Sequence, residues 1–142
     1  EMLFDKYKID RNAINLDVSE GAAMENIDKT ANDFKLFKDF GLSLALDHFG
    51  AGYSSFKYLN MLPIDMIKID RSLIFDLTLN LKHQTTVKAI IELAHTLGYK
   101  VVAEGVETSQ EASILAALHC DYAQGYLYSR PLPANEFEEL LG

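Results

Sequence analysis

Two short apolar segments that each end at charged residues constrain the fold of this chain more than any other feature. The first, 42–47, ends at Asp47, and the second, 64–70, ends at Asp70. Near-continuous runs of Leu, Ile and Ala are typical of strands that are buried on both faces of a parallel sheet. In parallel α/β folds the ligand binds at the carboxyl ends of the strands. We therefore expect the chemistry of this chain around the two aspartates and their neighbours.

Helical segments separate the apolar runs along the chain. Apolar residues recur at helical spacing over 27–40 and 85–97, and the glycines that follow, Gly41 and Gly98, are expected C-caps. Strands are predicted at 13–18, 42–47, 64–70, 100–103 and 122–128. Helices are predicted at 27–40, 56–61, 85–97, 108–119 and 135–141, with the end of a further helix within 1–10.

This alternation predicts an α/β fold with a parallel sheet and outer helices. Five units are too few for a closed eight-stranded barrel, which takes about 250 residues. A small open sheet and a partial TIM-like (β/α) barrel both fit, and the helical start within 1–10 favours the partial barrel. Three smaller features are predicted: a loop at 19–21, a capping box of Thr108 and Glu111, and Asn135 as the N-cap of the last helix.

The composition excludes several classes of protein. The 142 residues are 49% hydrophobic, which suits one ordinary domain. No segment approaches the ~18 consecutive apolar residues of a membrane span, so we expect no direct membrane insertion. The net charge of −8 argues against DNA binding, which needs a basic face. Cys120 is the single cysteine, so no internal disulfide forms, and we expect a reducing, cytoplasmic location.

Polar and acidic residues stand near the carboxyl end of every predicted strand. In a barrel these positions converge on one mouth, where several carboxylates repel one another unless a divalent cation neutralises them. The set therefore predicts a metal site, although any single member is equally compatible with a helix cap or an exposed position. Its members are Asp17, Glu20, Asp47, Asp70, Glu104, Glu107 and Gln124.

Two cationic or neutral bases stand among these acids. Lys68 lies two residues before Asp70, so both side chains are expected on the same strand face. Lys68 is compatible with a Schiff base, with stabilisation of a nucleophile or phosphate, or with a buried Lys–Asp pair that has no catalytic role. Asp70 and Arg71 are equally compatible with an ion pair. His48 follows Asp47, and at a strand terminus both side chains can reach one cavity.

Four segments, in this order, resemble the EAL domain, the phosphodiesterase family that hydrolyses cyclic di-GMP. They are 46–55 (LDHFGAGYSS), 62–72 (LPIDMIKIDRS), 101–108 (VVAEGVET) and 124–133 (QGYLYSRPLP). The resemblance covers nearly the whole chain and implies a (β/α)₈-type barrel. We expect 1–142 to be the C-terminal part of one such domain, about its last five strands. The part with the Glu-Ala-Leu motif and the Asn-bearing strand is expected before Glu1.

The resemblance also implies roles for individual residues. Asp47 matches a metal ligand, Lys68 matches the lysine that contacts the attacking water or the phosphate, and Glu104 matches a glutamate of the metal and water network. Gln124 matches a glutamine of the same cavity, and Glu20 matches the glutamate that anchors the loop after Asp47. The family reaction is two-metal hydrolysis with Mg²⁺ or Mn²⁺ that yields linear pGpG.

Two site positions depart from the family pattern. Asp17 stands where the family has a metal-binding Glu, and His48 stands where the family has a second Asp. A neutral imidazole suits Zn²⁺ better than Mg²⁺. Gly21 replaces a small hydroxyl residue, which is a minor change. We therefore expect this chain by itself not to hydrolyse cyclic di-GMP.

Three functional interpretations follow. The first is a metal-dependent phosphodiesterase domain, and the second is a degenerate EAL domain that binds nucleotide or protein as a regulatory module without catalysis. The third is a Schiff-base lyase that uses Lys68, which the surrounding acids disfavour because they keep the amine protonated. Open strand edges predict a homodimer or higher oligomer. The family implies a GGDEF, sensor or membrane-anchor domain elsewhere in the parent protein.

Overall fold

The structure is a computed structural model that describes residues 2–51 and 59–141. Its helices are α1 (Met2–Tyr7), η1 (Arg11–Ala13), α2 (Glu20–Glu25), α3 (Ile27–Asp39), α5 (Arg71–Ile74), α6 (Leu81–Thr96), α7 (Ser109–Ala117) and α8 (Ala134–Leu141). Its strands are β1 (Asn15–Ser19), β2 (Ser43–Phe49), β3 (Met66–Ile69), β4 (Lys100–Glu104) and β5 (Tyr122–Gln124). All neighbouring strands pair in parallel, in the order β1-β2-β3-β4-β5.

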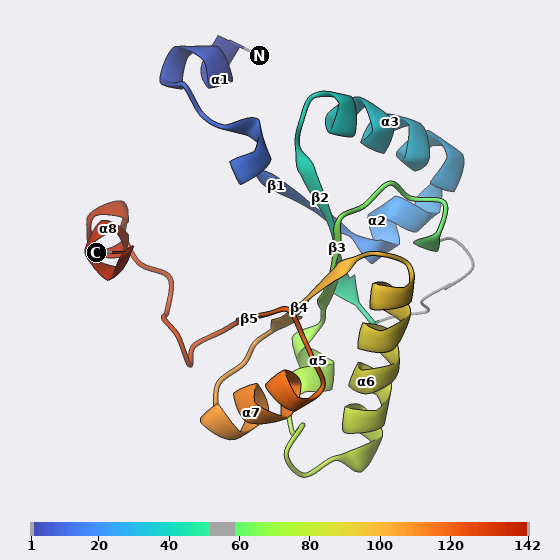
Figure 1. Cartoon of the computed structure of the whole chain (residues 1–142), viewed down its shortest axis with the longest axis vertical. Helices are drawn as coiled ribbons and strands as arrows, with labels where there is room; N and C mark the ends of the chain where they lie inside the picture. Colours follow the sequence, from blue (N-terminus) through green and yellow to red (C-terminus); the bar gives the residue numbers. More distant parts are fainter. Residues whose placement is uncertain (1, 52–58, 142) are drawn as a thin grey trace.

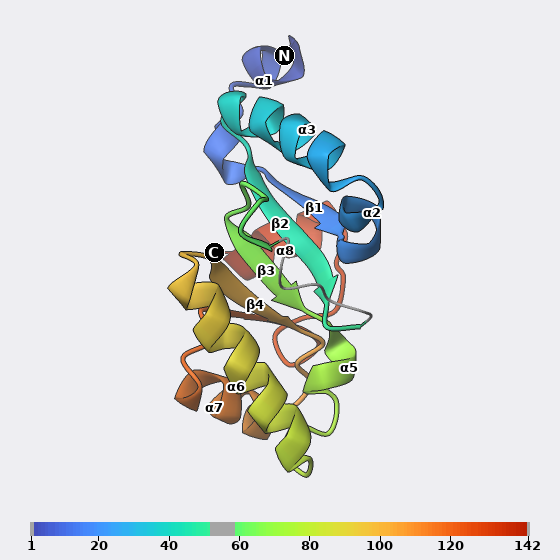
Figure 2. The same ribbon diagram turned by 90° about the vertical axis from the view of Figure 1, so that its right-hand side faces the viewer.

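Helices α2, α3, α6 and α7 cover one face of this sheet. Figure 1 shows α2, α3, α6 and α7 on one side of the strands, and α8 with the C-terminus on the other side. Figure 2 shows the same layering, with α3 and α6 in front of the strands and α8 behind them. Because β1 and β5 each pair with only one neighbour among the described residues, the sheet is open, as a partial barrel predicts.

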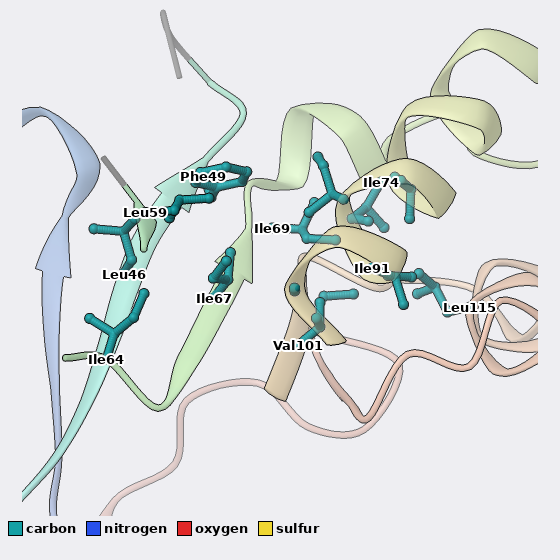
Figure 3. Close-up of a cluster of buried hydrophobic side chains, with 14 of the residues drawn as sticks. Leu46, Phe49, Leu59, Ile64, Ile67, Ile69, Ile74, Ile91, Val101 and Leu115 are labelled. Carbon is teal, nitrogen blue, oxygen red and sulfur yellow. The ribbon is translucent and has the colours of Figure 1, made fainter. Parts of the chain in front are cut away.

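Alternate residues of each strand build the core between the sheet and its helices. Ile67 and Ile69 of β3 are both buried in this cluster, to which α6 contributes apolar side chains such as Ile91 (Figure 3). Leu46 of β2 and Val101 of β4 enter the same cluster from the neighbouring strands. Full burial of one such side chain contributes about 1.5–3 kcal/mol. The next residue of each strand points to the opposite face, which α2, α3, α6 and α7 leave uncovered.

Most predicted elements are confirmed, and local hydrogen bonds explain their limits. The capping box is present: the Thr108 hydroxyl accepts from the N–H of Glu111, whose carboxylate accepts in turn from the N–H of Thr108. Gly41 and Gly98 follow α3 and α6 with φ of 86° and 85°, as expected of C-caps. Residues 56–58 of the predicted helix at 56–61 lie outside the described residues, and of the rest Leu59 is helical and 60–61 form a turn.

Three predictions of detail were wrong. Residues 19–21 are not a loop, because the Ser19 side chain accepts from the N–H of Ala22 and starts α2 directly after β1. The last strand is not 122–128 but ends at Gln124, after which the chain turns and the N–H of Leu127 donates to Val106. Asn135 is not a cap, since α8 begins one residue earlier.

Helices α5 and α6 also differ from the prediction. The four-residue helix α5 (Arg71–Ile74) has no apolar periodicity that marks it; it forms because the Asp70 side chain accepts from the N–H of Ser72. Helix α6 starts four residues before the predicted 85, where Asn80 caps it. Within the described residues no helix is long and apolar enough to cross a membrane.

Candidate active site

Polar residues gather on the sheet face opposite the apolar core, at the carboxyl ends of the strands. The alternation of β3 places Lys68 there, since its neighbours Ile67 and Ile69 point into the core. By the same alternation Asp17 of β1 and Glu104 of β4 lie on this face. Strand register brings these carboxyl ends together although the residues are far apart in sequence.

Lys68 is the centre of an ion-pair cluster. Its Nζ lies 2.6 Å from Asp17 Oδ2 and 3.0 Å from Glu104 Oε1, and only 11% of its side chain is exposed. Burial by itself lowers the pKa of Lys68, but the hydrogen bonds to Asp17 and Glu104 outweigh it and raise the pKa above its ordinary value. Lys68 is therefore a fixed ammonium group at neutral pH, which disfavours a Schiff-base role.

A second group of side chains lies beside this cluster. One possible ligand atom from each of Asp47, His48 and Glu104 lies within 4.8 Å of the others, a spacing that one metal ion can bridge. We call these three residues the metal-capable group. Adjacent residues of a regular strand point to opposite faces, yet Asp47 and His48 both reach this group. The register of β2 against β3 shifts between Leu46 and Phe49, and His48 has φ of 57°. This bulge re-aims the imidazole.

Asp70 holds the imidazole of His48 in place. Asp70 Oδ2 lies 3.0 Å from His48 Nδ1, and Asp70 Oδ1 accepts from the N–H of Ser72. The other ring nitrogen, Nε2, lies 3.6 Å from Asp47 Oδ2. The hydrogen bond to Asp70 and the charge of Asp47 raise the pKa of His48. Burial alone raises the pKa of Asp70, but hydrogen bonds from Ser72 and His48 outweigh it and lower the pKa.

The donor chemistry of this group fits a divalent cation. Carboxylate oxygens from Asp47 and Glu104 are hard ligands of the kind that Mg²⁺ and Mn²⁺ bind, and an imidazole nitrogen adds a ligand that suits transition metals. Asp47 and Glu104 are largely buried, with 19% and 18% of their side chains exposed. Two carboxylates held this close favour a cation between them.

The remaining predicted site residues lie around this centre. Gln124 is the register partner of Glu104 on β5 and exposes its side chain. Its neighbour Gly125 allows close packing, because a Cβ there would lie 2.1 Å from the carbonyl oxygen of Val106. Glu20 is buried at the first position of α2, just after β1. Glu107 is half exposed and lies 3.8 Å from Arg71.

The structure forms one of the two ion pairs that the sequence offered as alternatives: Lys68 has a buried pair with an aspartate, Asp17, but Asp70 and Arg71 do not pair with each other. Lys68 pairs with Asp17 and Glu104, whereas Asp70 contacts His48. Arg71 lies against Glu107, and Asp70 caps the helix that Arg71 begins. Sequence reasoning gave Asp70 a place in the site but not its contact with His48. The Asp-Arg-Ser sequence before α5 was the signal for the capping role.

Comparison with known proteins identifies the family. The model of the EAL domain matches residues 1–131, most of the chain. The chain belongs to the EAL domain family. The cyclic di-GMP phosphodiesterase NbdA of Pseudomonas aeruginosa is 47% identical over 128 residues, which are 90% of this chain and 16% of that protein. The chain therefore spans a small share of this curated relative.

Solved structures of EAL proteins have the same arrangement of strands and helices. A structure described as the PaMucR phosphodiesterase in complex with c-di-GMP superposes with a TM-score of 0.89 at 36% identity, and it covers 94% of this chain and 54% of that one. The Klebsiella pneumoniae protein BlrP1, in a manganese and cy-diGMP complex, gives a TM-score of 0.84 at 32% identity over 92% of this chain and 34% of that one. The EAL domain neighbours confirm the family and the partial-barrel fold.

Proposed function

We propose that this chain is the C-terminal portion of an EAL barrel domain that hydrolyses cyclic di-GMP to linear pGpG. One observation carries the proposal. Donor atoms of Asp47, His48 and Glu104 lie within 4.8 Å of one another, and the Lys68 ammonium lies 3.0 Å from the same Glu104. A cation site and a fixed positive charge at one sheet end suit a phosphodiester, whose hydrolysis develops negative charge on phosphate oxygens.

Each side chain has a task in this reaction. Asp47, His48 and Glu104 would hold a divalent cation, Mg²⁺ or Mn²⁺ in the family, which supplies an acidified water and neutralises phosphate charge when bound. Lys68 is fixed by two carboxylates, so its ammonium can face the phosphate without reorganisation. Glu104 would accept the proton of the attacking water. The water oxygen bonds to phosphorus, the P–O3′ bond breaks, and the leaving O3′ takes a proton from solvent.

The outer residues have supporting tasks in the same proposal. Gln124, beside Glu104 in the sheet, contacts the nucleotide, and Asp17 holds Lys68 and completes the ligand set of the metal region. Asn15 donates to Asp17 Oδ1 at 2.9 Å and fixes the carboxylate that Lys68 uses. Glu20 supports the loop after Asp47. Glu107 lies outside the metal-capable group and pairs with Arg71 at the edge of the site.

We further propose that the 142-residue chain does not turn over cyclic di-GMP by itself. Its described strands form an open sheet, and α2, α3, α6 and α7 cover only one face of that sheet. In a closed barrel, residues of further strands would complete the mouth. The same open edges support a homodimer or higher oligomer. A GGDEF or sensor domain in the parent protein, and a cytoplasmic location of the domain, belong to the same proposal.

His48 favours a second candidate function, a regulatory EAL module that binds nucleotide or protein without catalysis. Its imidazole replaces an oxygen ligand and is held by Asp70 at 3.0 Å. If this arrangement excludes a catalytic cation, the site retains Lys68 and the surrounding polar residues for binding alone.

One experiment separates the two functions. The parent protein that carries this chain is incubated with cyclic di-GMP and Mg²⁺ or Mn²⁺, and pGpG is quantified by chromatography. Metal-dependent pGpG formation supports the phosphodiesterase. Saturable binding of cyclic di-GMP without pGpG supports the regulatory module. If His48→Asp alone restores turnover to an inactive parent, the imidazole is the defect. Absence of both binding and turnover refutes the phosphodiesterase and the nucleotide-binding form of the regulatory module.

A further inference from the structure

The bulge at the end of β2 builds a histidine–carboxylate arrangement that the family function does not require. His48 Nδ1 lies 3.0 Å from Asp70 Oδ2, so this nitrogen is engaged by a carboxylate. His48 Nε2 points toward the metal-capable group and lies 3.6 Å from Asp47 Oδ2. Histidines that bind metals through one ring nitrogen almost always donate the other N–H to a carboxylate, carbonyl or water, which fixes the tautomer and the ring.

The distances fit ligation of a single small ion. Zinc bonds to nitrogen and carboxylate oxygen are about 2.0–2.1 Å long, so two ligands at a tetrahedral angle lie roughly 3.3 Å apart. The separation of 3.6 Å between His48 Nε2 and Asp47 Oδ2 is close to that value. Glu104 supplies a third donor within 4.8 Å. One imidazole and two carboxylates leave room for water in the fourth position, as in catalytic zinc sites.

We propose that His48, positioned by Asp70, tunes this site for Zn²⁺ over Mg²⁺. Mg²⁺ demands near-octahedral oxygen ligands, whereas imidazole is a preferred ligand of Zn²⁺. His48 is thus a selectivity-determining ligand, and Asp70 is its positioning residue. The inference rests on the proposed function for the location of the metal, but it concerns which ion the site prefers.

The backbone supports this assignment. A non-glycine residue at φ of 57° is uncommon, and the bulge between Leu46 and Phe49 places His48 there. The N–H of His48 donates to Asp47 Oδ1 at 2.8 Å, which leaves Oδ2 of that carboxylate on the side of the ring nitrogen. The two ligands are therefore oriented together by one local turn.

The test measures ion binding to the 142-residue chain without nucleotide. ZnCl₂ and MgCl₂ are titrated separately by calorimetry, and Co²⁺ absorption reports imidazole ligation directly. Most protein sites bind Zn²⁺ more tightly than Mg²⁺, so the informative quantity is the ratio of the two dissociation constants. We expect His48→Asp to reduce that preference for Zn²⁺ at least ~10-fold and to change the Co²⁺ spectrum.

Asp70→Asn is the second variant. Asparagine caps helices about as well as aspartate, so the N-cap of α5, which contacts the N–H of Ser72, should be kept. Loss of the carboxylate that orients His48 should weaken Zn²⁺ binding ~10–100-fold while Mg²⁺ binding changes little. His119→Asp is the matched control, because His119 is also an exposed histidine at positive φ, 62°, outside the metal-capable group. It should leave both affinities unchanged.

Each outcome decides the inference. It is overturned if His48→Asp keeps the Zn²⁺ to Mg²⁺ ratio, or if Asp70→Asn lowers both affinities equally. It is also overturned if the His119 control shifts the ratio as much as the His48 variant does. The failure of this inference can be distinguished from the failure of the proposed function. If the parent forms pGpG with Mg²⁺ but the site shows no preference for zinc, only the inference is rejected. A zinc-selective chain whose parent neither binds nor cleaves cyclic di-GMP rejects only the function.

Discussion

The two ends of the parallel sheet carry charged clusters that differ in their balance of acidic and basic groups. At the amino end, Asp121 lies next to β5 and accepts hydrogen bonds from the N–H of Val101, from Lys100 at 2.6 Å and from His95 at 2.7 Å. Asp65, before β3, accepts from Lys38 and from the N–H of Leu44 in the same way. Each carboxylate there is paired with a cation and a backbone donor.

The carboxyl end has more acids than bases. Asp17 and Glu104 share the ammonium of Lys68, and Asp47 and Asp70 both face the imidazole of His48. The amino end is therefore balanced internally and links helices to strands. The carboxyl end keeps a surplus of negative charge that favours a cation. The comparison shows that the same residue types stabilise the fold at one end and prepare a ligand site at the other.

Substitutions at the two ends should differ most in their effect on catalysis. In the parent protein, Lys68→Met should reduce pGpG formation at least ~100-fold, because it removes the charge that faces the phosphate. Lys100→Met removes the exposed lysine of the amino-end cluster and should leave turnover unchanged. Steady-state rates of both variants test this. Equal losses of activity would abolish the distinction between the ends.

Stability should respond in the reverse order. Asp121→Asn at the amino end should lower the free energy of unfolding of the chain by about 1–2 kcal/mol at pH 7, since the carboxylate anchors Val101, Lys100 and His95. Asp47→Asn at the carboxyl end should change it by less than ~1 kcal/mol, because it relieves repulsion in an acidic group. Urea unfolding compares them. A larger loss for Asp47→Asn would contradict this order.

The pH dependence of stability isolates the amino end. Burial alone raises the pKa of Asp121, but hydrogen bonds from Lys100 and His95 outweigh it and lower the pKa to about 2. A carboxyl group with a lowered folded-state pKa stabilises the fold above its unfolded pKa and loses that contribution as the pH falls toward the folded value. Wild type should therefore lose on the order of 1 kcal/mol relative to Asp121→Asn between about pH 4 and pH 2, after allowance for solvent screening.

Parallel unfolding curves at several pH values measure this difference. A wild-type advantage over Asp121→Asn that stays constant down to pH 2 would show that the Asp121 charge does not stabilise the amino end.

The smallest expected effect belongs to the exposed amino-end pair. Lys38 and Asp65 have 35% and 36% of their side chains exposed, although Nζ lies 2.6 Å from Oδ1. Exposed pairs contribute about 0–1 kcal/mol, so Lys38→Met should cost less than ~1 kcal/mol in urea unfolding. The effect should shrink in high salt. A larger, salt-independent loss would mean that Asp65 depends on Lys38 to hold the N–H of Leu44.

Much of the fold was predictable because the central strands β2, β3 and β4 are buried and therefore nearly continuous in apolar residues. The run before Asp47 and the run around Lys68 are nearly continuous apolar segments, and the helices carry glycine C-caps and a capping box. The family followed from four motifs in order. The short helix α5 was not predictable from periodicity, since four residues carry none, and the end of β5 was set by the packing of Gly125 against Val106.

The sequence by itself determined the order of elements, the family, and which side chains stand at the strand ends, because burial period and strand-end polarity are local properties of the chain. Only the tertiary structure decided which of these side chains contact one another. Strand register joins Lys68 to Asp17, 51 positions away, and a bulge in β2 turns His48 toward Asp70 and Asp47. Such pairings depend on how far one strand is shifted along the next. The pattern of apolar residues in the sequence does not report that shift.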